Sequence, residues 1–183
     1  MNTTAIIILV IVAILILIIL SKYNKMIKLQ NEVKKSKSGI DVYLNQRFDL
    51  IPNLVECVKG YTKHEKEVLE NVTKLRMEYM KGNKNIKKAE KINDELNKIL
   101  AIAENYPELK ASEQFLNLQK NLSKMESQLQ AARRIYNNEV TKYNTNISVV
   151  PNNIIAKMFG FKEMDLFEIE EFKRENIDIN IEG

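Results

Sequence analysis

An N-terminal run of apolar residues limits what this chain can fold into more than any other feature. Ala5 to Leu20 are sixteen consecutive residues, of which fourteen are Ile, Leu or Val. With the hydroxyl residues that flank it, the run extends about 28 Å as a helix at roughly 1.5 Å per residue. This length is close to the roughly 30 Å of a bilayer's hydrocarbon core. No charge interrupts the run, and each Leu, Ile or Val favours membrane insertion by about 0.3–0.6 kcal/mol. Residues 5–20 are therefore predicted to cross a membrane, and residues 1–22 to form the transmembrane anchor.

The flanks of this run predict its orientation. Lys22, Lys25 and Lys28 follow it, whereas nothing basic precedes it except the terminal amine. The positive-inside rule therefore predicts a single-pass protein of the cell membrane with its N-terminus outside and its body in the cytoplasm. These lysines are also placed to bind anionic headgroups. A cleaved signal peptide is the alternative, but the run lacks a basic n-region and a small-x-small cleavage site after Leu20.

The remaining composition is typical of long helices. The 183 residues include five glycines, three prolines and no tryptophan, and Lys, Glu, Asn, Ile and Leu are abundant. The length suits one domain with a core of its own. One cysteine cannot form an internal disulfide, and one cysteine with one histidine cannot build a zinc cluster. No cofactor is predicted.

Apolar residues recur at steps of three and four and predict four helices, the first of which continues from the transmembrane span. The expected helices run to about Arg47, from Ile51 to Met80, from Ala89 to Ala103, and from near Ser112 to Ile147. Each has one apolar stripe and short connections join them, so the predicted fold is all-α, with the N-terminal transmembrane helix followed by an antiparallel four-helix bundle. A parallel trimeric or tetrameric coiled coil built on the last helix is the alternative.

Local signals set the expected boundaries. Asp49 is the expected N-cap of the second helix and Pro52 fits its first turn, which predicts a corner between two helices at residues 48–51. Gly60 then falls inside the second helix, where close approach of a neighbouring helix would explain it.

The C-terminal part changes in texture. Pro151 ends the fourth helix, Asn152 or Asn153 is the expected cap of a short helix that closes one bundle end, and Gly160 stops that helix. The bundle with this capping helix is assigned to residues 23–162. From residue 163 onward the sequence has eight acidic residues and two basic ones. Residues 163–183 are therefore predicted to be an acidic, partly disordered tail.

Polar residues gather between residues 40 and 65, and this stretch supplies the candidate interaction or structural residues: Asp41, Arg47, Asp49, His64 and Glu65. A di-iron bundle needs two Glu-x-x-His motifs, which one histidine cannot supply, so no metal is predicted. The expected role of the arginine is to pair with a carboxylate of this stretch between the first two helices. No nucleophile–base pair or Gly-rich phosphate loop is present, so no catalytic residue is predicted. One arginine pair, Arg133-Arg134, is too little for a nucleic-acid surface, so nucleic acid is not an expected partner.

Several blocks follow one another in a characteristic order: Tyr23-Asn24, IDVYLNQRFDLIPNLVECVKGYTKHE, AENYPELKASEQFLNLQ, ARRIYNNEVTKYN and VPNNIIAKMFGF. Through them the chain, from about Tyr23 to Glu171, resembles the LemA family of bacterial membrane-anchored proteins. The resemblance implies a single N-terminal span and a four-helix bundle. It implies no enzymatic activity, because none is established for the family, and it suggests a membrane protease as a partner, because family genes often neighbour such proteases.

The features together favour a membrane-anchored scaffold that binds protein partners or forms a homo-oligomer. A lipid-binding or membrane-organising oligomer is the alternative, and an enzyme of unknown type is the residual one.

Overall fold

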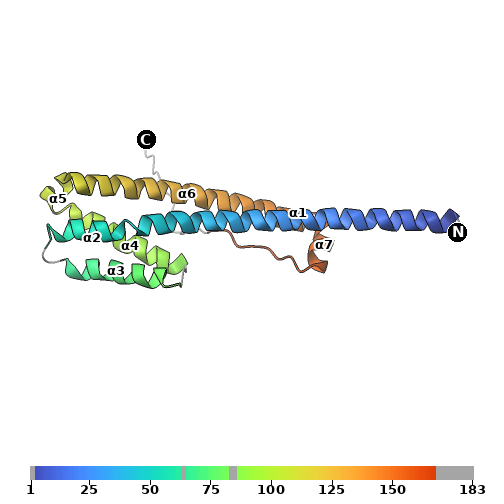
Figure 1. Ribbon diagram of the computed structural model, residues 1–183, viewed down its shortest axis with the longest axis horizontal. Coiled ribbons are helices and arrows are strands. Elements are labelled where there is room, and N and C mark those ends of the chain that lie inside the picture. Colours follow the sequence, from blue (N-terminus) through green and yellow to red (C-terminus); the bar gives the residue numbers. More distant parts are fainter. Residues whose placement is uncertain (1–2, 63–64, 83–85, 168–183) are drawn as a thin grey trace, which may run out of the picture. The chain divides into compact units, whose positions relative to one another are not determined.

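The computed structural model describes residues 3–62, 65–82 and 86–167, and the described chain is helical with no strand (Figure 1). The predicted all-α class is therefore confirmed. The helices are α1 (Thr3–Phe48), α2 (Ile51–Lys59), α3 (Lys66–Met80), α4 (Ile86–Ala103), α5 (Pro107–Ala111), α6 (Glu113–Ser148) and α7 (Asn152–Met158). They fall into two compact units, one from residues 1–37 and 133–183 and the other from residues 38–132. Helices α1 and α6 contribute to both units.

Helix α1 contains the apolar run without interruption. It is 46 residues long, and its N-terminal part is long and apolar enough to cross a membrane. The large side chains from Ile6 to Ile18 and that of Leu20 are exposed, as a lipid-facing helix requires, whereas Ile19 packs against other helices. The N-terminal segment is thus a candidate membrane anchor and not the buried core helix of a soluble domain.

The unit of residues 38–132 is a four-helix bundle of the predicted class, and it lies within the residues 23–162 that the sequence assigns to the bundle. The end of α1 continues into α2, and α3, α4 and the first half of α6 complete the bundle. Each helix turns an apolar stripe inward, as the spacing of three and four predicts. Core side chains that are fully buried come from every one of these helices: Phe48, Leu54, Val72, Ile92, Leu96, Ile99 and Leu129.

The chain reverses at a different place from the predicted one. At residues 48–51 it does not fold back, because the Asp49 N–H still donates to the Asn45 carbonyl at 2.9 Å and Leu50 keeps helical angles. Helix α2 continues onward from α1 in Figure 1, and α3 packs beside α2. The predicted corner is therefore wrong, and the reversal lies between Lys59 and Lys66.

The predicted second helix is consequently two helices. Helix α2 ends at Lys59, and Gly60 follows it with φ −64°, an angle open to any residue. A Cβ at Gly60 would lie 3.4 Å from the Cys57 carbonyl oxygen of its own turn. Gly60 therefore marks a helix end and not a close approach between helices, which corrects the expectation.

Helix α5 was not predicted, because its five residues are too few to show a periodic pattern. Tyr106 has an extended φ of −123°, as a residue before proline prefers, and Pro107 then opens the helix. The buried Leu109 attaches α5 to the core.

In the other unit, α1, α6 and α7 share a second apolar core. Its buried members are Met26 and Val33 from α1, Val140, Tyr143 and Ile147 from α6, and Ile155 and Ala156 from α7. The short helix that the sequence assigned to a bundle end lies against α1 and α6 within this unit.

The ends of α7 test the expected caps. The stop at Gly160 is confirmed: Gly160 has φ +74°, and the Phe161 N–H donates to the Ala156 carbonyl at 2.9 Å, which is the Schellman pattern. The asparagine cap is wrong. Pro151 occupies the cap position without a side-chain bond, and the Asn152 amide donates to the Asn146 carbonyl at 3.0 Å.

Candidate functional site

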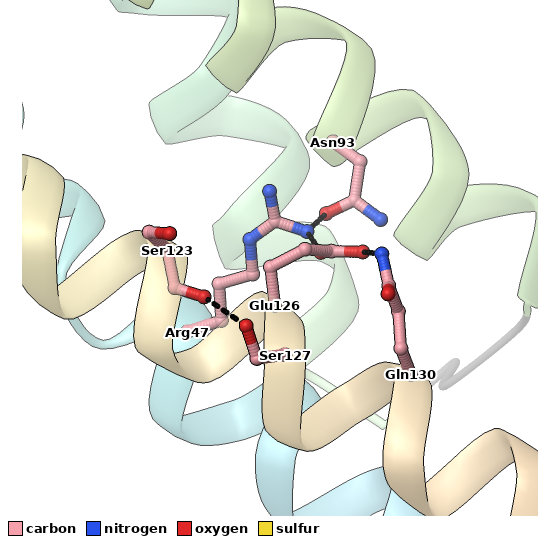
Figure 2. A network of polar contacts seen from close by, with 6 residues as sticks. All are labelled: Arg47, Asn93, Ser123, Glu126, Ser127 and Gln130. Carbon is pink, nitrogen blue, oxygen red and sulfur yellow. Dashed lines mark hydrogen bonds and ion pairs between the residues drawn. The ribbon is translucent and has the colours of Figure 1, made fainter.

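A buried arginine joins three helices of the bundle (Figure 2). Arg47, 6% exposed, lies in the last turn of α1. Its Nη1 donates to Asn93 Oδ1 on α4 at 2.9 Å and is paired with the Glu126 carboxylate on α6. Gln130 Nε2 also donates to this carboxylate at 3.2 Å. Because charge-assisted bonds of a buried guanidinium are strong and directional, the network sets the position of α1 against α4 and α6.

Asn93 and Glu126 lie outside the polar stretch of residues 40–65 that holds the candidate residues. The side chain of Arg47, which is itself buried, reaches these two residues on α4 and α6. Pairing of Arg47 with a carboxylate of residues 40–65 stays a prediction. The chain sequence does not bring these residues near Arg47, and only the packed bundle does.

Asp49 and Arg76 form a clamp at the junction of α1 and α2. Pro52 has no N–H, so the carbonyl of Phe48, four residues earlier, lacks its helical donor. Arg76 Nε on α3 donates to this carbonyl at 2.7 Å, and Nη2 donates to Asp49 Oδ1 at 3.0 Å. The cap position belongs to Leu50 and carries no side-chain bond, so the expected Asp49 cap is wrong. Asp49 instead ties α3 to the junction.

The other predicted polar residues are spread over this unit. Asp41 is close enough to Tyr79 that its charge adds to burial in raising the pKa of that phenol. Glu65 precedes α3 and makes no side-chain cap bond there. His64 lies outside the described residues. The structure therefore places Arg47 and Asp49 in two separate interhelical contacts, and these contacts share no residue.

The described residues offer little to covalent or metal chemistry. Burial raises the pKa of the Cys57 thiol, while a hydrogen bond with Ser112 partly lowers it. A raised pKa disfavours the thiolate, which is the nucleophilic form. Within residues 3–62, 65–82 and 86–167, no three His, Cys, Asp or Glu side chains gather as metal ligands.

Two Tyr–Asn pairs on α6 hold an extended segment, residues 161–167. Tyr143 donates to the Lys162 carbonyl at 2.9 Å, and Tyr136 donates to the Asp165 carbonyl at 3.1 Å. The asparagine that follows each tyrosine makes two hydrogen bonds with one residue of the segment. Asn144 accepts from the Met164 N–H at 3.0 Å and donates to the Met164 carbonyl at 2.8 Å. Asn137 accepts from the Phe167 N–H at 2.7 Å and donates to the Phe167 carbonyl at 3.0 Å. Arg133 also lies 4.7 Å over the Phe167 ring.

The spacing of these pairs explains the fit. Seven helical residues rise about 10.5 Å, and three extended residues span about 10 Å. The contacts repeat every seven residues on α6 and every three on the segment, running in opposite directions. The repeated Tyr-Asn of ARRIYNNEVTKYN is the sequence signal that these contacts carry. Residues 163–167 belong to the predicted tail, whose remainder, residues 168–183, lies outside the described chain.

The lysines that flank the anchor lie on α1, just after the apolar run. Lys25 and Lys28 are exposed and Lys22 is half-buried. Tyr23 stacks on this end of the unit, with its ring centroid 4.9 Å from that of Phe159 and 5.7 Å from that of Phe161. The Tyr23-Asn24 block therefore begins the contact between the anchor helix and the segment after α7.

A shallow, open polar groove lies between α2 and α6 in the bundle unit. Its volume is about 460 Å³, and its lining residues are Asn53, Glu113, Gln114, Asn117, Leu118 and Asn121. Four of the six are amides, which both donate and accept hydrogen bonds. The groove can therefore pair with backbone groups but contains no catalytic set.

Comparison with known proteins agrees with the architecture. The family model described as LemA family matches residues 36–181. Protein LemA of Metamycoplasma hominis is 24% identical over 159 residues, which is 85% of this chain and 73% of that protein. Magnetosome protein MamQ of Magnetospirillum gryphiswaldense is 22% identical over 178 residues, 81% of this chain and 65% of its own length. Magnetosome protein MamQ 1 of Paramagnetospirillum magneticum is 21% identical over 179 residues, which is 82% of this chain and 66% of that protein.

The family model covers most of the chain, including the bundle, the Tyr–Asn pairs and α7. The resemblance found in the sequence blocks is thereby confirmed. This chain belongs to the LemA family.

Proposed function

We propose that this protein is a membrane-tethered scaffold whose helical bundle binds protein partners on the cytoplasmic side. The observation that carries the proposal is the continuity of α1, in which one helix from Thr3 to Phe48 contains both the candidate anchor and the first helix of the bundle. A tether of this kind raises the effective concentration of partners held in the same membrane, so weak contacts suffice.

The groove between α2 and α6 is the proposed partner surface. Asn53, Asn117 and Asn121 present amides to solvent there. Further along the same helix, Asn137 and Asn144 pair with the backbone of an extended segment. The ligand we propose for the groove is therefore an extended segment of a partner protein, whose backbone N–H and C=O groups would pair with these amides. A membrane protease is the partner class suggested by the family resemblance.

The cytoplasmic placement of the bundle rests on charge. Lys22, Lys25 and Lys28 follow the candidate span, and lysines near a span stay on the cytoplasmic side. The same lysines favour a second candidate function, a membrane-organising oligomer that binds anionic lipid. The two functions differ in what contacts the bundle, which is another protein in the first case and a second copy of this chain in the second.

Site-specific photocrosslinking in intact cells tests the proposal. A photoreactive residue replaces Asn117 in the groove, and Asn97, an exposed asparagine on α4, is the matched control. The expected result is a discrete adduct with a different protein at Asn117 that is weak at Asn97 and lost with Asn121→Arg. Adducts that are equal at both positions would refute the groove, and adducts only between copies of this chain would favour the oligomer.

A further inference from the structure

Helix α7 is apolar on two faces, and only one of them is buried by the described chain. Ile155 and Ala156 are 7% and 3% exposed in the core shared with α1 and α6. On the other face, Ile154 is 66% and Met158 62% exposed. Val150 before the helix and Phe159 after it are exposed as well. Four large apolar side chains exposed within ten residues are typical of a site that contacts another apolar phase.

This exposed face belongs to a cluster that also holds the end of the candidate span. Tyr23, whose ring contacts Phe159 and Phe161, follows Leu20 by three residues, or about 4.5 Å of helix. Ile19, inside the apolar run itself, packs against the core that holds α7. The end of the candidate span and α7 therefore share one packed cluster.

Charge and ring chemistry around α7 suit a lipid surface. Lys25 and Lys28 on α1 and Lys157 and Lys162 near α7 are exposed. Glu163 and Asp165 are the acidic residues of the segment 161–167, and Glu163 accepts a hydrogen bond from Ser148 at 3.1 Å. Lysines of this kind attract anionic headgroups at about 1 kcal/mol each near the surface. Aromatic rings also concentrate at the membrane–water boundary.

We propose that α7 is an interfacial helix: Val150, Ile154, Met158 and Phe159 enter the headgroup–acyl boundary of the bilayer that α1 crosses. The inference rests on the anchor of the proposed function, and it adds a second point of membrane contact. With two contacts on one packed cluster, this part of α1 cannot rotate freely about its axis, so the orientation of the unit of α7 is set relative to the membrane. A second copy is a poorer occupant, because it would bring the same lysines against these lysines.

Single-tryptophan depth measurements test this assignment, because the natural sequence has no tryptophan. The full chain carrying Ile154→Trp or Met158→Trp is reconstituted in phosphatidylcholine–phosphatidylglycerol vesicles with brominated acyl chains. Ile135→Trp is the matched control: Ile135 is 56% exposed on α6, twelve residues or about 18 Å of helix before Ile147 of the shared core. Leu15→Trp marks the span.

The expected result is at least twofold quenching at Ile154→Trp and Met158→Trp, strong quenching at Leu15→Trp and none at Ile135→Trp. Circular dichroism verifies that each variant is folded. Quenching at both α7 positions no greater than at Ile135→Trp, with Leu15→Trp quenched, overturns the inference and leaves the anchor intact. Unquenched emission that shifts to the blue as the protein-to-lipid ratio rises assigns the face to a second copy and also overturns it. An unquenched Leu15→Trp removes the anchor and the inference together.

Discussion

Arg47 is the residue through which three helices of the bundle are held in register. Its side chain is 8% exposed, whereas that of its partner Glu126 is 31% exposed. A buried charge without its partner is costly, while replacing both partners by apolar groups is often neutral. The pair therefore contributes more to the specificity of helix packing than to net stability.

This asymmetry gives a prediction for a double-mutant cycle. Glu126→Met leaves the more buried charge uncompensated and is expected to lower the free energy of unfolding by about 3 kcal/mol. Arg47→Met leaves the better-hydrated carboxylate and is expected to cost less, about 2 kcal/mol. The double variant recovers most of the loss. Chemical unfolding of the full chain in mild detergent, followed by circular dichroism, measures all three.

Arg134→Met is the control, because Arg134 is exposed on α6 and its loss is expected to stay within about 0.5 kcal/mol. Strictly additive single variants would show that Arg47 and Glu126 are not coupled.

Tyr79 makes the stability of the bundle depend on alkaline pH. Burial, and second the charge of Asp41, raise its pKa above the ordinary 10.0. Below pH 10 the phenol is neutral in both states and its contribution is complete. As the pH rises above 10 the unfolded chain ionises first, so stability falls, by at most about 1.4 kcal/mol per pH unit for one proton. We expect this fall to shrink in Tyr79→Phe and, to a smaller extent, in Asp41→Asn. Parallel pH profiles for all three chains would contradict the assignment.

At the scale of elements, periodicity predicted the long helices well and the breaks poorly. The stripe from Ser112 to Ile147 predicted α6 to within one residue at each end, and the stripe from Ala89 to Ala103 predicted the end of α4 but began three residues late. The helix start expected at Pro52 is present, but the expected corner is not. The chain at Leu50 keeps helical angles, and the Phe48 carbonyl accepts a hydrogen bond from Arg76 instead. The true turn at Gly60 was missed because a glycine is compatible with both a helix end and a helix interior.

The site could be predicted only where partners are local. Arg47 was identified because polar residues gather between residues 40 and 65, but Asn93 and Glu126, which it contacts, lie 46 and 79 residues away. The segment of residues 161–167 has no regular hydrogen-bond pattern of its own, so no periodic signal predicts it. The heptad repeat of Tyr-Asn on α6 was the available clue.

The Tyr–Asn contacts predict which backbone amides of residues 161–167 resist exchange. The N–H groups of Met164 and Phe167 donate to Asn144 and Asn137 at 3.0 and 2.7 Å. Amide-resolved hydrogen exchange should find both protected. Asn144→Ala is expected to speed exchange at Met164 about five- to tenfold, in line with about 1 kcal/mol for one hydrogen bond.

Asn144→Asp keeps the acceptor oxygen and should retain part of the protection. The neighbouring exposed Asn138→Ala is the control and should change neither amide. If the Met164 amide of the unaltered chain exchanges as fast as in an unstructured peptide, the hydrogen bonds between α6 and this segment are refuted.

At the scale of the whole molecule, the orientation of the chain across the membrane is a prediction from charge. In a Cys57→Ser background, Thr3→Cys should react in intact cells with a maleimide that cannot cross membranes. Lys124→Cys, exposed on α6 in the bundle unit, should react only after permeabilisation. The reverse pattern would place the bundle outside the cell and would remove the cytoplasmic part of the proposed function.

The central claim is that the anchor makes the bundle an effective partner-binding scaffold, and one measurement tests it directly. The yield of the Asn117 photocrosslink is compared in cells between the full chain, a chain whose residues 5–18 are replaced by an unrelated apolar span, and a chain lacking residues 1–18. The last chain keeps Ile19 and with it the core around α7, and circular dichroism verifies its fold. We predict an unchanged yield with the replaced span and a yield at least tenfold lower without one, because tethering supplies effective concentration. Equal yields with and without a span would contradict the account.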